Sequence, residues 1–133
     1  MIIATWNVNS ILARMSSVMR WLDTANPDVL CMQETKCTDD KFPILLFQER
    51  GYQCQLFGQQ SYNGVAILTR ETCDTTHRGY PGDDETAQSR LITTTVNGIH
   101  IINVYIELLL DKSCNLVFHL RVFDILLCLL IHG

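Results

Sequence analysis

Two polar residues that follow short apolar runs carry the strongest chemical signal in this sequence. Asn7 comes after the run Ile2–Ala4, and Glu34 comes after the run Val29–Cys31. Short apolar runs bounded by polar residues are typical of buried strands, and open α/β sheets place their sites at the carboxyl ends of strands. An amide oxygen and a carboxylate at that edge are hard ligands suited to Mg²⁺. The pattern therefore predicts a metal site that contains Asn7 and Glu34.

A helix is expected between these two strands. Ser10 is a suitable N-cap for residues 11–25, in which apolar side chains recur at helical spacing. The segment Asn26–Asp28 contains a proline that ends the helix and leads into the second strand. A strand, a helix and a strand in this order favour a crossover connection and an α/β architecture.

The rest of the first hundred residues is predicted to form mainly strands. A short helix starts near Pro43 and reaches Arg50, with Gly51 just past its end. The dipeptide Asn97–Gly98 is a strong hairpin signal, and residues 79–88 form a polar surface loop. The predicted strands span residues 52–57, 64–69, 90–96 and 99–106.

Composition restricts the class of protein only loosely. A chain of 133 residues fits one domain with a buried core. Its net charge of −4 is not typical of a protein that holds DNA by neutralising phosphates, although an enzyme can engage phosphate through a metal and a few placed cations. The six cysteines have no Cys-x-x-Cys spacing, and no signal peptide is apparent. We expect a reduced, intracellular protein, cytoplasmic or, in a eukaryote, nuclear.

Five segments in a fixed order resemble the exonuclease III family of DNA-repair nucleases, a branch of the endonuclease/exonuclease/phosphatase superfamily. The resemblance covers about residues 1–105 and implies a four-layer α/β sandwich, of which this chain would form the first half, with the second half missing. The matching segments are Ala4-Thr5-Trp6-Asn7-Val8-Asn9-Ser10, Pro27-Asp28-Val29-Leu30-Cys31-Met32-Gln33-Glu34-Thr35-Lys36, Tyr62-Asn63-Gly64-Val65-Ala66-Ile67-Leu68, Gly79-Tyr80-Pro81-Gly82-Asp83-Asp84 and Asn103-Val104-Tyr105.

The resemblance also implies an activity and a set of site residues. The family acts on double-stranded DNA as a Mg²⁺-dependent 3′–5′ exodeoxyribonuclease and abasic-site endonuclease, with Mn²⁺ as an alternative ion. It implies that Asn7 and Glu34 bind the metal and that Tyr105 is a catalytic hydrogen-bond donor near the phosphate. Lys36 and Arg90 are candidates for contacts with DNA phosphate, and a solvated surface cation is the alternative reading for both.

The sequence after Tyr105 departs from the family pattern. Residues 1–106 are expected to form the N-terminal part of the family's domain, and residues 107–133 a non-homologous apolar tail. The Asp-His pair that the family uses to activate water has no counterpart in this sequence, so we expect the chain to be truncated and inactive alone. The alternative is a non-catalytic fragment that binds a membrane or a partner through the tail, although the tail lacks the run of apolar residues that a membrane span needs.

A truncated sandwich would have a further consequence. One face of its sheet would lie under the helix at residues 11–25, and the other face would lack its partner sheet. Such an exposed apolar face would favour self-association or aggregation, unless the tail covered it.

Overall fold

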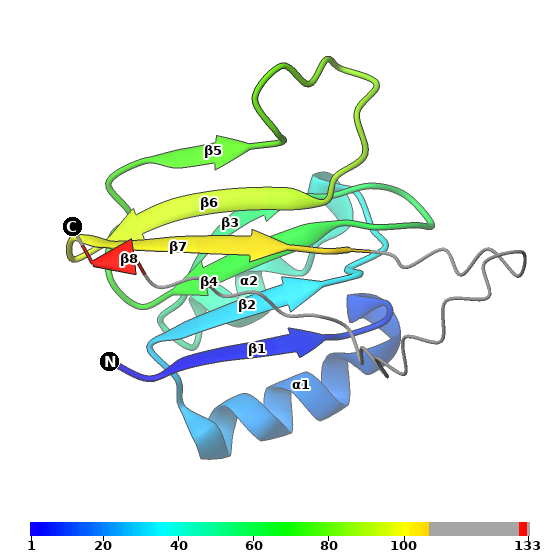
Figure 1. Ribbon diagram of the computed structural model, residues 1–133. Helices are drawn as coiled ribbons and strands as arrows, with labels where there is room; N and C mark the ends of the chain where they lie inside the picture. The colour runs from blue at the N-terminus through cyan, green and yellow to red at the C-terminus, as the bar shows by residue number, and fades with distance from the viewer. Residues whose placement is uncertain (107–130, 133) are drawn as a thin grey trace, which may run out of the picture.

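Two four-stranded sheets form the framework of the computed structural model, which describes residues 1–106 and 131–132 (Figure 1). The strand order is β1-β2-β4-β3 in the first sheet and β5-β6-β7-β8 in the second. The strands are β1 Ile3–Asn7, β2 Val29–Gln33, β3 Gln53–Phe57, β4 Val65–Thr69, β5 Thr76–Arg78, β6 Leu91–Val96, β7 Ile99–Val104 and β8 Ile131–His132. The helices are α1 Ile11–Ala25, the short 3₁₀ helix η1 Asp39–Lys41 and α2 Ile44–Gln48.

The first strand, helix and strand form the predicted crossover. β1 and β2 pair in parallel, and α1 connects them. The hydroxyl of Ser10 accepts a hydrogen bond from the backbone N–H of Ala13 at 3.3 Å, as expected of an N-cap. At the other end Asn26 adopts a left-handed conformation, and its N–H donates to the carbonyl of Leu22. These two caps explain why the helix has the predicted bounds.

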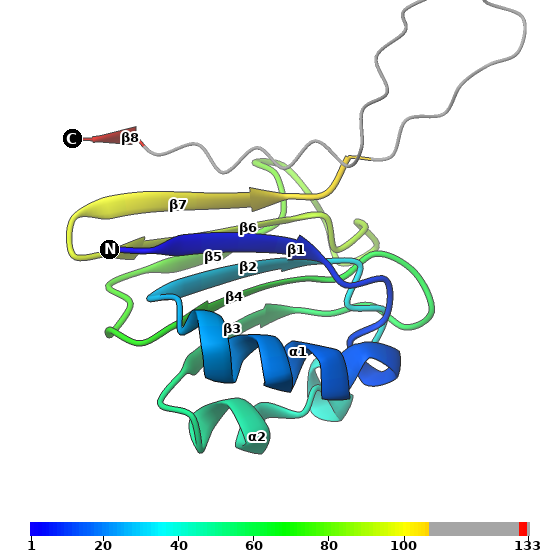
Figure 2. The same ribbon diagram turned by 90° about the horizontal axis from the view of Figure 1, so that it is seen from below.

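The two faces of the first sheet are both covered. The helices lie on one face and the second sheet lies on the other (Figure 2). Side chains from β2 and β4 pack against side chains from β6 and β7 in a shared apolar core that includes Cys31, Ile67, Ile92 and Ile101, each at most 1% exposed. The prediction of an exposed apolar sheet face is therefore wrong, because this chain itself supplies the partner strands. Self-association was predicted from that exposed face, so this reason for it no longer applies. Self-association stays an untested prediction.

The remaining strand predictions hold with small differences at their ends. β6 begins at Leu91, one residue after the predicted start, and β7 ends at Val104, two residues before the predicted end. Strand β5, which forms the edge of the second sheet, was not predicted at all. It consists of three residues beside a polar loop, and such a short segment has no recognisable period-2 pattern.

Two Asn-Gly turns place their residues in the left-handed region of backbone space. Asn97 and Gly98, with φ of +50° and +75°, connect β6 to β7 as predicted. Gly64, with φ of +86°, precedes β4 and lies against the loop after β2. A Cβ atom on Gly64 would lie 2.2 Å from the Thr35 hydroxyl, whereas a Cβ on Gly98 would meet nothing within 4 Å.

Replacing Gly64 with alanine is therefore expected to destabilise the fold more than replacing Gly98. Both substitutions put a side chain at positive φ, which costs on the order of 1 kcal/mol, and only Gly64→Ala adds a steric clash. Urea unfolding of the two variants measures the difference. Equal losses of stability would contradict the close approach of Gly64 to Thr35.

The predictions made for the tail at residues 107–133 lie outside the described residues, apart from the backbone of β8. Among the residues that the structure describes, no helix has the length and apolar character needed to span a membrane.

Candidate active site

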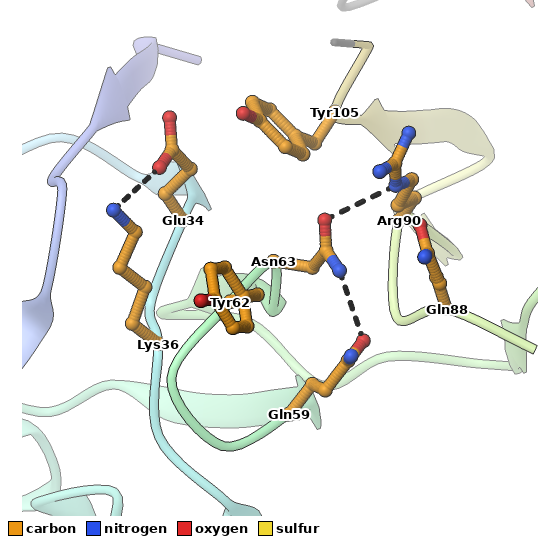
Figure 3. Close-up of a pocket in the computed structure, with 8 residues that line it drawn as sticks. All are labelled: Glu34, Lys36, Gln59, Tyr62, Asn63, Gln88, Arg90 and Tyr105. Atoms are coloured by element: carbon orange, nitrogen blue, oxygen red, sulfur yellow. Dashed lines mark hydrogen bonds and ion pairs between the residues drawn. The ribbon is translucent and has the colours of Figure 1, made fainter.

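A pocket of about 450 Å³ lies beyond the carboxyl ends of β2 and β7 (Figure 3). Its residues lie in loops and directly beside the strand ends of both sheets, so the pocket depends on how the two sheets pack. The residues that line it are Glu34, Lys36, Gln59, Tyr62, Asn63, Gln88, Arg90 and Tyr105.

Glu34 is the centre of the hydrogen bonding at this site. Its Oε1 accepts a hydrogen bond from Nδ2 of Asn7 at 2.8 Å, and its Oε2 forms an ion pair with Nζ of Lys36 at 2.9 Å. Tyr105, which follows β7 of the second sheet, also lowers the pKa of this carboxylate, and Figure 3 shows its hydroxyl directed toward Glu34. A single carboxylate thus joins the ends of β1, β2 and β7.

The ammonium group of Lys36 lies between two oxygen atoms. Besides its ion pair with Glu34, its Nζ donates a hydrogen bond to Oδ1 of Asn9 at 2.6 Å. The carboxylate oxygen of Glu34 and the amide oxygen of Asn9 therefore converge on one positive charge. Oxygen donors of this kind also suit Mg²⁺.

The backbone around the site is unusual. In the two loops that follow β1 and β2, four residues that are not glycine have positive φ: Asn9 at +41°, Ser10 at +79°, Glu34 at +51° and Lys36 at +53°. Such conformations cost of order 1–3 kcal/mol each and gather at functional sites. Backbone hydrogen bonds hold the loops together, because the N–H of Ser10 donates to the carbonyl of Glu34 at 2.8 Å. The strain is therefore maintained by contacts between the two loops that carry the site.

The far side of the pocket carries Arg90. Its guanidinium lies 5.8 Å from the centre of the Tyr105 ring, and its Nε donates to Oδ1 of Asn63 at 3.1 Å. The amide of Asn63 in turn donates to Oε1 of Gln59 at 3.1 Å. This network orients a permanent positive charge at the pocket wall, where an anion could be bound.

The structure brings the predicted site residues together. Asn7 donates a hydrogen bond to Glu34, and Glu34 lines the same pocket as Tyr105, Lys36 and Arg90. Their individual roles stay predictions, and two details qualify them. The Asn7 amide turns its nitrogen toward Glu34 and its oxygen toward the N–H of Asn9. Lys36 is paired with Glu34 in this arrangement.

Several residues of the site were not identified from the sequence. Asn9 lies two positions after Asn7 in the same segment, which was a usable signal. Gln59 and Asn63 lie in a loop between β3 and β4 and bond to each other, and the contact of Asn63 with Arg90 depends on packing between the sheets. Such a contact has no counterpart in local spacing.

Other metal or nucleophile chemistry finds little support in the described part of the chain. Within it, no group of three or more histidine, cysteine, aspartate or glutamate side chains is placed to hold a metal ion. Its four cysteines are free thiols, and burial raises the pKa of Cys54 to about 12. A thiol with such a pKa stays protonated at neutral pH and is a poor nucleophile.

Comparison with known proteins identifies the family of this chain. The family described as "Endonuclease/Exonuclease/phosphatase family" matches residues 4–128, which is nearly the whole chain. The chain belongs to the endonuclease/exonuclease/phosphatase family. This membership confirms the wider superfamily that the five sequence segments indicated.

Relatives place the chain in the exonuclease III and AP endonuclease branch of that family. It is 35% identical over 88 residues to exodeoxyribonuclease III of Haemophilus influenzae, an alignment that covers 66% of this chain and 33% of that protein. It is also 30% identical over 109 residues to recombination repair protein 1 of Drosophila melanogaster, covering 78% of this chain and 16% of that protein. The chain therefore spans a third or less of the length of these curated relatives.

Solved structures confirm the α/β fold class. The structure of the 3′ phosphatase NExo from Neisseria, bound to a product DNA hairpin, is 44% identical with a TM-score of 0.75. An AP endonuclease from Archaeoglobus fulgidus is 42% identical with a TM-score of 0.73. Each match covers 79% of this chain and 41% of the solved one.

The predicted site residue Glu34 should make the stability of the fold depend on pH. Burial raises the pKa of Glu34, but hydrogen bonds from Asn7, Lys36 and Tyr105 and the charge of Lys36 outweigh it, so the pKa lies below the ordinary value. A carboxyl group whose pKa falls on folding stabilises the fold above its unfolded pKa, about 4.3 for glutamate. That contribution is lost as the pH falls through the folded pKa.

The expected result is a difference in unfolding free energy between the wild type and Glu34→Gln that shrinks as the pH falls from 6 to below 4. Urea unfolding at several pH values measures it. The exposed carboxylate Glu49 provides the control, because Glu49→Gln makes the same change in net charge outside the pocket. A constant difference between wild type and Glu34→Gln would show that the Glu34 pKa does not change on folding.

Proposed function

We propose that the pocket is part of a Mg²⁺-dependent site for hydrolysis of DNA phosphodiesters, at abasic sites and at 3′ ends. The convergence of Asn7, Glu34 and Tyr105 from two sheets carries this proposal. The printed names of the relatives, an exodeoxyribonuclease and an AP endonuclease, support the substrate class. Mn²⁺ is an alternative ion.

The donors at the site suit a hard divalent cation. Glu34 is held as an anion at neutral pH, and the oxygens of Glu34 and Asn9 already converge on the ammonium of Lys36. We infer that Glu34 is the metal ligand contributed by this part of the chain, with Asn7 as a further ligand or as the residue that orients the carboxylate. A bound metal would neutralise charge that develops on the phosphate during hydrolysis.

The remaining polar residues act on the anionic substrate. Tyr105 presents a hydroxyl group that can donate a hydrogen bond to a phosphate or leaving oxygen. The guanidinium of Arg90 faces the same pocket and can bind a phosphate. Lys36 can do the same once a metal ion replaces its ammonium beside Glu34.

The described residues place no His–acid pair at the pocket that could act as the base and activate water. His100 bonds to Thr95 on the second sheet, and His77 lies on β5 of that sheet, neither of them lining the pocket. A positioned base typically contributes 10²–10⁴-fold to a rate. We therefore propose that the described residues bind metal and DNA and that, without such a base, their cleavage is at least about 10²–10⁴-fold slower than that of an enzyme with one, down to no activity.

A labelled duplex with one abasic site tests the proposal. Cleavage by the chain is measured with Mg²⁺ and with EDTA, beside the exodeoxyribonuclease III of Haemophilus influenzae, and binding of Mn²⁺ is measured by electron paramagnetic resonance. We expect Mn²⁺ binding and, at most, slow cleavage that EDTA abolishes. Cleavage as fast as that of the comparison enzyme would refute the missing base. A folded sample that binds neither metal nor DNA would refute the proposed site.

A further inference from the structure

Asn103 connects the second sheet to the middle of the first. It lies on β7, is 2% exposed, and belongs to the buried polar residues of the chain. Its Nδ2 donates hydrogen bonds to the carbonyls of Met32 at 2.8 Å and Ala66 at 2.9 Å. Its Oδ1 accepts a hydrogen bond from Nε2 of Gln33 at 2.7 Å. One side chain is thus bonded to both β2 and β4, and we call these three bonds the Asn103 clamp.

The hydrogen bonds of the clamp are directional, whereas the apolar contacts around them are not. The core between the sheets consists mainly of valine and isoleucine side chains, whose hydrophobic attraction is non-directional. Other hydrogen bonds between the sheets join β5 to β3, as from Arg78 Nε to the carbonyl of Leu56, or join the loop between β3 and β4 to residues 89–90 before β6, as from the N–H of Gly64 to the carbonyl of Ser89. Among the described residues, the Asn103 clamp is what bonds β7 itself to β2, and it therefore fixes how far β7 lies along β2.

The clamp lies close in sequence to Glu34 and Tyr105, the residues that the two sheets contribute to the site. Gln33 immediately precedes Glu34, and Asn103 lies two positions before Tyr105. Residues two apart on a strand share a face and are separated by about 6.6 Å. A hydrogen bond tolerates only a few tenths of an ångström of displacement before it weakens. A shift of β7 along β2 would therefore separate the Tyr105 hydroxyl from the Glu34 carboxylate.

We propose that Asn103, together with Gln33, is a positioning residue that holds the Tyr105 hydroxyl against the Glu34 carboxylate by locking the second sheet onto the first. It acts through Tyr105 and touches neither substrate nor metal. Its consequence for catalysis rests on the proposed function, whereas its effect on the Tyr105 environment does not.

Fluorine NMR of the 133-residue chain labelled with 3-fluorotyrosine tests the proposal without metal or DNA. Tyr105→Phe assigns the Tyr105 resonance by its disappearance, and Glu34→Ala gives the position of that resonance in the absence of the Glu34 carboxylate. Asn103→Leu removes the whole clamp. Gln33→Met removes one of its three bonds and serves if the first variant does not fold. Ile101→Val is the control, because Ile101 is buried on the same strand and makes none of the clamp's bonds.

The expected result is a shift of the Tyr105 resonance toward its position in Glu34→Ala, in each folded clamp variant. Ile101→Val should leave the Tyr105 resonance in its wild-type position although it also lowers stability. An unchanged Tyr105 resonance in a folded clamp variant would overturn the proposal. An equal shift in Ile101→Val would also overturn it, because Tyr105 would then report general loosening of the core. Failure of the chain to cleave DNA would refute the proposed function and leave this result intact.

Discussion

Replacing Glu34 with glutamine is expected to lower the affinity for Mn²⁺ at least tenfold and to bring any Mg²⁺-dependent DNA cleavage to background. The carboxylate is the anionic group at which the contacts of Asn7, Lys36 and Tyr105 converge. A glutamine keeps the size of the side chain but removes the negative charge that a divalent cation requires. Loss of an outer-shell partner alone typically costs 10–100-fold in metal affinity, so loss of a direct ligand should cost at least as much.

Electron paramagnetic resonance of Mn²⁺ and cleavage of the abasic duplex measure these two effects. Glu49→Gln removes a carboxylate that is exposed and outside the pocket, so it controls for the change in net charge. Circular dichroism shows whether each variant is folded. Wild-type Mn²⁺ affinity in folded Glu34→Gln, or an equal loss in Glu49→Gln, would remove Glu34 from the metal site.

The first strand, helix and strand could be predicted from sequence because their signals are local. Ser10 and Asn26 cap α1 through bonds to residues three or four positions away, and the apolar runs of β1 and β2 are bounded by polar residues. Parallel pairing then brings Asn7 and Glu34 to one edge. The pairing of these two residues therefore follows from local patterns and the rule for strand ends.

The second sheet could not be predicted in the same way. Strands β6 and β7 were recognised as a hairpin, but nothing in their alternating pattern says which sheet they pack on. Contacts such as Asn103 with Gln33 join residues 70 positions apart. Their formation depends on the packing of the two sheets, which local spacing does not encode. The exposed apolar face was consequently a wrong prediction, and the Gln59–Asn63–Arg90 network was missed.

Replacing Ile67 with alanine is expected to cost about 2–5 kcal/mol of unfolding free energy, the usual range for such a truncation in a core. Ile67 lies on β4, is 0% exposed, and belongs to the core shared by the two sheets. If β4 instead presented this face to solvent, the substitution would change stability by at most about 0.5 kcal/mol. The size of the loss therefore decides whether the chain closes its own sandwich.

Urea unfolding measures this loss, and Leu45→Ala is the matched control because Leu45 is 73% exposed on α2. Where Ile67→Ala leaves no folded protein, Ile67→Val and Ile92→Val provide a double-mutant cycle across the sheets. Side chains that share a core typically show coupling of about 0.5–3 kcal/mol, whereas distant ones are additive. A small loss in Ile67→Ala or, where that variant does not fold, additive effects of the two valine substitutions would mean that the sheets do not pack. The Asn103 clamp and the meeting of Tyr105 with Glu34 would then have no physical basis, since both require β7 to lie against β2.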